Sequence, residues 1–130
     1  MKNTISIILS TLATMLVYFL GGWDISLKLL ITAVILDYIT GLLKAIYYKK
    51  VNSTIGAKGI LKKIGYFIIV AVAVIIDHIT GETGAIRTLV IYFFVANEGI
   101  SIVENWGSMG LPLPQKIIDV LEQLKNSNTN

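Results

Sequence analysis

Residues 27–45 have the sequence LKLLITAVILDYITGLLKA, and this stretch decides how the rest of the chain is interpreted. It holds about 20 mostly apolar residues, enough for a helix to cross a hydrocarbon core of about 30 Å at about 1.5 Å per residue. Asp37, Thr40, Gly41 and Lys44 recur within it at helical spacing, so they form one polar stripe. A carboxylate facing lipid costs about 2.5–3.5 kcal/mol on insertion scales. We therefore expect the stripe to face protein or water, in a helix that takes part in an assembly.

The composition is that of a membrane protein. Hydrophobic residues make up 55% of the 130 residues and charged residues only 15%, whereas soluble domains carry about 25% charge. The mean hydropathy is +0.75. The chain has no cysteine, which excludes a disulfide framework and thiolate chemistry. The net charge of +3 comes from basic residues beside apolar runs, which indicates membrane orientation and no nucleic-acid partner.

The apolar runs predict an all-α membrane protein with four transmembrane helices and a short C-terminal amphipathic helix. The connections after the first and third spans are short, which favours two antiparallel hairpins. Residues 1–103 are expected to form the transmembrane domain, and residues 104–130 a cytoplasmic tail that contains the short helix. The predicted spans are residues 4–20, 25–46, 64–80 and 85–103, with a basic loop at 47–63.

The basic loop sets the predicted orientation. From residue 44 to residue 63 there are six lysines and no acidic residue, so the loop and both termini are expected on the cytoplasmic side. Lysines near a membrane surface attract anionic lipid by about 1 kcal/mol each. The candidate lipid-surface contacts are Lys49, Lys50, Lys58, Lys62 and Lys63.

Ionisable side chains inside the spans are the candidate functional residues. Left unpaired in lipid, Asp37, Asp77, Arg87 and Glu98 would together cost on the order of 10 kcal/mol, comparable to the stability of a whole domain. Arg87 and Glu98 are about three helical turns apart and so share a face. The face is either the wall of a water-filled hole or a set of interhelical bonds that holds the bundle together. The candidate pore-lining or assembly residues are Asp37, Thr40, Lys44, Asp77, Arg87, Asn97, Glu98 and Ser101.

Two of these candidates have an equally good alternative. Asp77 and Arg87 lie near the outer membrane surface in this topology, where a charge is simply interfacial. No catalytic arrangement is apparent, because His78 is the single histidine and no cysteine is present. We therefore expect no enzyme activity, no metal site and no cofactor.

The ordered motifs resemble the toxin-secretion/phage-lysis holin family over about residues 25–125. They comprise D-x-I-T-G at 37–41, S-x-x-G-x-K-G-x-x-K-K at 53–63, Asp77, N-E-x-x-S-x-x-E-N at 97–105 and M-G-x-P-x-P at 109–114. The resemblance implies a phage-encoded, multi-pass protein of the bacterial inner membrane. It further implies that copies homo-oligomerise and open lesions through which an endolysin or a toxin leaves, so that the host cell lyses.

Two other functions remain open from the sequence. A small four-helix transporter or ion channel would use an intramembrane acid as its site, and D-x-I-T-G recurs at 77–81 as in an inverted repeat. An antiholin-type accessory protein would instead block the hole of a partner. A transporter passes small solutes selectively, whereas a holin lets a folded enzyme through.

Overall fold

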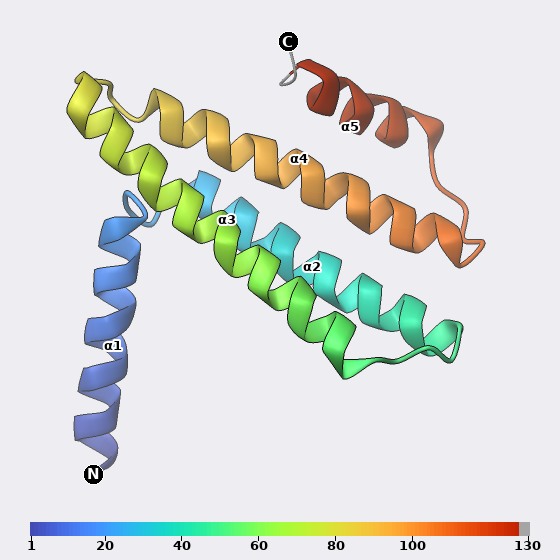
Figure 1. The fold of residues 1–130 in the computed structure, drawn as a ribbon, viewed down its shortest axis with the longest axis horizontal. Coiled ribbons are helices and arrows are strands. Elements are labelled where there is room, and N and C mark those ends of the chain that lie inside the picture. The colour runs from blue at the N-terminus through green and yellow to red at the C-terminus, as the bar shows by residue number, and fades with distance from the viewer. Residues whose placement is uncertain (128–130) are drawn as a thin grey trace.

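The computed structural model describes residues 1–127, and this part of the chain is helical without strands (Figure 1). The first four helices are long and apolar enough to cross a membrane, which confirms the predicted all-α architecture with four candidate spans. Residues 128–130 of the predicted tail lie outside the described part. The helices are α1 (Lys2–Phe19), α2 (Ile25–Tyr47), α3 (Ser53–Thr80), α4 (Ala85–Ser108) and α5 (Gln115–Ser127).

Side-chain caps and glycines set several helix ends. Asp24 begins α2 by accepting a hydrogen bond from the Leu27 N–H at 3.0 Å, and Asn52 begins α3 by accepting from the Thr54 N–H at 2.9 Å. Such caps satisfy N–H groups that have no partner within the helix. Gly81 ends α3 with a φ of 72°, a left-handed conformation that glycine adopts without steric cost.

The predicted basic loop is the clearest difference from the sequence interpretation. Residues 53–63 are helical, so α3 begins at Ser53 and the connection from α2 is short. The Asn52 cap and the good helix propensity of lysine favour this extension over a loop. It also holds Lys63 on a rigid element, facing the neighbouring helices.

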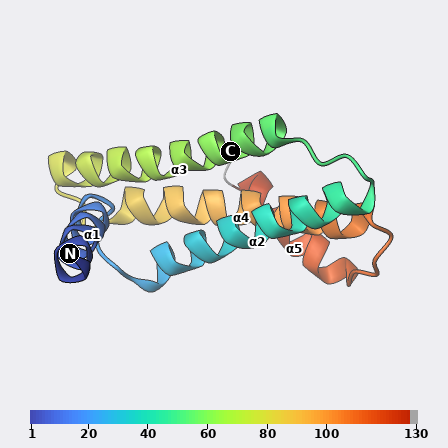
Figure 2. The same cartoon turned by 90° about the horizontal axis from the view of Figure 1, so that it is seen from below.

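Three helices form the packed bundle. Figure 2 shows α4 between α3 on one side and α2 on the other. Leu30, Val70 and Ile91, one from each helix, are completely buried where the three meet. α3 and α4 run antiparallel as predicted, whereas α2 runs in the same direction as α4 (Figure 1).

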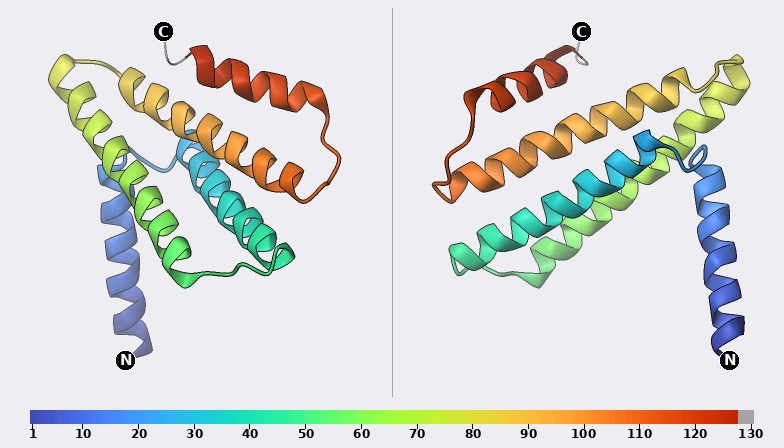
Figure 3. Two further views of the ribbon diagram at one scale, coloured as in Figure 1. Left: turned by 45° about the vertical axis from the view of Figure 1, so that its right-hand side comes forward. Right: turned by 180° about the vertical axis from the view of Figure 1, so that it is seen from behind.

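The N-terminal helix is not packed against its neighbour as a hairpin. α1 diverges from α2 in every view (Figures 1 and 3), and none of its residues is buried. The hydroxyls of Ser10, Thr11 and Thr14 each donate to a carbonyl four residues earlier at 2.8 Å. Because these polar groups are satisfied within the helix, α1 needs no protein partner and can be surrounded by lipid.

The short C-terminal helix lies along α4 (Figure 1). Its Leu121 approaches Gly99 so closely that a Cβ at that glycine would lie 3.0 Å from Leu121 Cδ2. Glycine therefore allows this contact, whereas a larger residue would push α5 away. Ile117, Val120 and Leu124 of α5 remain about half exposed and form the rest of its apolar side.

Candidate functional site

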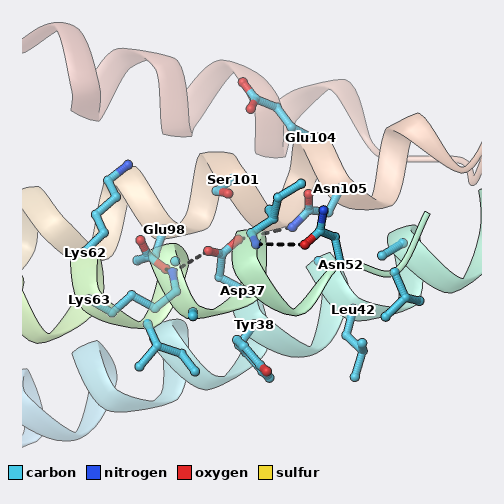
Figure 4. A pocket seen from close by; sticks show the side chains of 18 of the residues that line it. Asp37, Tyr38, Leu42, Asn52, Lys62, Lys63, Glu98, Ser101, Glu104 and Asn105 are labelled. Carbon is cyan, nitrogen blue, oxygen red and sulfur yellow. Dashed lines mark hydrogen bonds and ion pairs between the residues drawn. The ribbon is translucent and has the colours of Figure 1, made fainter.

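A cluster of three charged side chains joins the three packed helices (Figure 4). Lys63 Nζ on α3 lies 2.5 Å from Asp37 Oδ2 on α2 and 2.5 Å from Glu98 Oε2 on α4. The three side chains are only 13%, 12% and 3% exposed, respectively. The Asp37–Lys63–Glu98 cluster thus places two carboxylates and one ammonium in the interior of a single chain.

Neutral polar groups extend this cluster along α4. Asn105 Nδ2 donates to Asp37 Oδ1 at 3.2 Å and to Thr40 Oγ1 at 3.1 Å. Asn97 Nδ2 donates to the Tyr66 hydroxyl at 3.3 Å. The predicted polar stripe of α2 and the predicted polar face of α4 therefore meet.

A half-open cleft of about 720 Å³ lies beside the cluster, where α2 ends and α3 begins. Asp37, Lys63, Glu98 and Ser101 line it (Figure 4). The exposed Lys50 and Lys62 line it as well. Lys44 does not line it, and within residues 1–127 this lysine forms no ion pair. No group of three potential metal ligands occurs in the described part of the chain.

A second cluster at the other end of the bundle contains Arg87. Its Nη1 lies 2.6 Å from Asp24 Oδ2, its Nη2 lies 3.1 Å from Asp24 Oδ1, and its Nε donates to the Leu20 carbonyl at 2.6 Å. Nη2 also donates to the Gly22 carbonyl at 3.1 Å. Arg87 is only 7% exposed, so its bonds tie the start of α4 to the α1–α2 connection. We call this set of contacts, from Arg87 to Asp24, Leu20 and Gly22, the clasp.

The contacts of Arg87 explain why residue 21 is a glycine and why the pKa of Asp24 is lowered. A Cβ at Gly21 would lie 2.4 Å from Arg87 Nε, and this glycine has a φ of +90°. Only glycine accommodates both constraints. The hydrogen bond from Arg87 holds the pKa of Asp24 below its ordinary value, and the Leu27 N–H contributes in the same direction.

Asp77 caps the next helix. Its two carboxylate oxygens accept the backbone N–H groups of Ile86 at 3.0 Å and Arg87 at 2.9 Å. The side chain is 4% exposed, so the end of α3 is tied to the start of α4. Asp77 and Arg87 therefore fit the interpretation in which polar groups hold the bundle together.

The main signal missed in the sequence is the role of Lys63. It was predicted to contact lipid, yet it is buried between two carboxylates, because α3 starts earlier than expected. The remaining predicted lipid contacts are exposed: Lys49, Lys50, Lys58 and Lys62. Two acids inside the predicted spans were the signal that a cation must reach them, but Lys44 and Arg87 were equally plausible partners from helical spacing.

The single chain satisfies its own buried polar groups. Within the described residues, no buried side-chain nitrogen or oxygen lacks a hydrogen-bond partner. The sequence alone suggested a cost on the order of 10 kcal/mol for unpaired charges. In this structure that cost does not by itself require a second copy.

Comparisons with known proteins agree with the resemblance seen in the motifs. The model of the bacteriophage holin family matches residues 14–126. An uncharacterized 14.9 kDa protein encoded in the nagH 3′ region of Clostridium perfringens is 40% identical over 97% of this chain and 98% of its own length. The uncharacterized protein YqxH of Bacillus subtilis is 34% identical over 96% of this chain and 89% of its own.

A Listeria monocytogenes protein, also uncharacterized, is 41% identical over 80% of this chain and 74% of its own length. No solved structure matches. The family match covers most of the chain, including all the helices that build the two clusters. The chain therefore belongs to the bacteriophage holin family.

Proposed function

We propose that this protein acts as a holin. Copies accumulate in the bacterial cytoplasmic membrane, oligomerise and open lesions that release an endolysin or a toxin, and the host cell lyses. The observation that carries the proposal is the match of the holin family to residues 14–126. The apolar surface of the four long helices supports insertion into a membrane.

The internal pairing of charges supports a quiet state before lysis. A single copy turns large apolar side chains outward along each long helix, among them Ile35, Ile68 and Leu89. Its buried Asp37 and Glu98 carboxylates are paired with Lys63. Such a copy can sit in lipid without conducting.

Lesion formation then requires the Asp37–Lys63–Glu98 cluster to separate. In the proposed assembly, the polar faces of α2 and α4 exchange their internal partners for water in a shared lumen. The proposed lining is Asp37, Thr40, Lys44, Asn97, Glu98 and Ser101. Asp77 and Arg87 are proposed to keep the outer end of each copy together.

Lysis in a bacterium tests the proposal directly. The chain is expressed with and without an endolysin, while membrane potential and culture turbidity are followed. We expect the potential to collapse abruptly in both cultures and turbidity to fall only with the endolysin. A culture that keeps its potential while the protein accumulates in the membrane would refute the proposal.

Two variants of α4 test the site. Glu98→Gln weakens the cluster and is expected to change the time of collapse, whereas Glu104→Gln alters an exposed acid and is the control. Equal timing in both variants would remove the cluster from the mechanism.

A small-solute channel is the second candidate, because the cleft places two carboxylates and a lysine beside an open space. Such a channel would dissipate an ion gradient without releasing a folded enzyme. Leakage of a fluorescent protein from loaded vesicles separates the two functions.

A further inference from the structure

The cleft lies between α2 and α3, which flank α4 (Figure 2). Residues of α4 line it as well. Three glycines line it, namely Gly41, Gly56 and Gly59. A Cβ at Gly59 would meet nothing within 4 Å, and one at Gly56 would only reach the Tyr38 hydroxyl at 4.0 Å. The structure therefore leaves space here that side chains do not fill.

The lining of the cleft combines apolar side chains with two exposed lysines. Large exposed apolar side chains from α2, the connection and α3 line it: Leu42, Val51, Ile55 and Ile60. Lys50 and Lys62 line it as well, and both are exposed. Apolar walls next to two free cations match an amphiphile with a negative head group.

Three acidic residues and three lysines line the cleft, so the match depends on where these charges lie and not on a net positive charge. Asp37 and Glu98 already pair with Lys63. Glu104 of α4 also lines the cleft, but its carboxylate points away from the Asp37–Lys63–Glu98 cluster (Figure 4). Lys50 belongs to the α2–α3 connection and Lys62 to α3. Lys49 and Lys58 add positive charge near the same end of the bundle but do not line the cleft.

We propose that this cleft binds one anionic phospholipid. Lys50 and Lys62 supply the positive charge that attracts its phosphate, and an acyl chain lies between α2 and α3 against the apolar wall. This site differs from a general attraction of the basic segment to a charged membrane, because it uses particular lysines and a particular space. It does not depend on lesion formation, so it stands or falls separately from the proposed holin function.

The experiment measures lipid binding to the full-length chain. Delipidated protein in detergent micelles is titrated with phosphatidylglycerol or phosphatidylcholine, and bound lipid is counted by native mass spectrometry. Lys50→Gln/Lys62→Gln is compared with Lys49→Gln/Lys58→Gln, which removes the same charge outside the cleft. We expect the first pair to weaken phosphatidylglycerol binding about 25-fold, at about fivefold for each lysine, and the second pair much less.

A second pair of variants tests the space. Gly59→Leu fills the cleft, and Gly65→Leu is its control on the same helix, since Gly65 also has nothing within 4 Å but does not line the cleft. Both changes raise helix propensity, so both proteins should keep their helical circular dichroism spectrum. We expect Gly59→Leu to lose the bound lipid and Gly65→Leu to retain it.

Three results would overturn the site. Equal losses of phosphatidylglycerol binding in the two double lysine variants would show that the lysines act only through the general positive charge of this segment. Retained lipid in Gly59→Leu would place it elsewhere. Displacement by glycerol 3-phosphate at an equal concentration would show that the acyl chain contributes nothing.

Discussion

Replacing Lys63 by methionine tests whether one chain really satisfies its own buried charges. The change keeps an unbranched side chain of similar length but removes the ammonium group that lies 2.5 Å from both Asp37 Oδ2 and Glu98 Oε2. Removing one partner of a buried ion pair costs about 3–5 kcal/mol, because the other charge is left unpaired. Since two carboxylates lose their partner here, we expect a loss of at least that size, a large part of a total stability of about 5–15 kcal/mol.

The assay is unfolding of the purified protein in detergent micelles by added sodium dodecyl sulfate, followed by circular dichroism. Lys58→Met is the control, because Lys58 is an exposed lysine on the same helix. Surface substitutions of this kind change stability by about 0.5 kcal/mol or less. The triple variant Lys63→Met/Asp37→Asn/Glu98→Gln removes the charges together and should recover most of the loss.

One outcome would refute the reasoning. If Lys63→Met unfolds at the same detergent composition as Lys58→Met, the two carboxylates are not held by Lys63 in the folded chain. Water or another copy would then have to face them, as in a preformed lumen.

Three further predictions concern the clasp and the C-terminal helix. Arg87 lowers the pKa of Asp24, so the stability that this pair contributes is present above the ordinary pKa of a carboxyl group and is lost as the pH falls through the lowered pKa. Asp24→Asn should therefore reduce the loss of stability at acidic pH in a pH–stability curve. An unchanged loss at acidic pH would contradict this prediction. Gly21→Ala should destabilise the protein by about 1–3 kcal/mol from backbone strain alone, and more from the clash with Arg87 Nε, in the same unfolding assay. Gly99→Val should displace Leu121 and release α5 without unfolding the bundle, so limited proteolysis should cut the tail faster while the helices of the bundle stay protected.

The sequence predicts the helices well because long apolar runs leave few alternatives. Residues 25–47 contain no helix breaker except Gly41, and α2 covers Ile25–Tyr47, within a residue of its predicted range. The start of α3 was missed because lysines and glycines at 56–63 have no apolar period that favours a helix over a loop. The local signals were the Asn52 cap and the helix propensity of lysine.

The partners of the charged residues were harder to predict than the residues themselves. Helical spacing correctly placed Arg87 and Glu98 on one buried face of α4. It could not show that Arg87 pairs with Asp24, which is 63 residues away, because that pairing depends on how α1, α2 and α4 meet. For the same reason Lys63 was assigned to the lipid surface, whereas in the structure it belongs to α3 and pairs with Asp37.

Internal pairing changes where the driving force for the proposed assembly must come from. A copy with satisfied charges gains nothing electrostatically from a neighbour, so the first contacts between copies must use apolar surface such as α1, which buries no residue in the single chain. If one copy opened its cluster alone, Asp37 and Glu98 would face hydrocarbon, at about 2.5–3.5 kcal/mol for each charge. Copies that open side by side instead expose these groups to shared water. On the proposed mechanism, opening is therefore unfavourable for a few copies and favourable for many, and the onset of lysis should depend steeply on the amount of protein in the membrane.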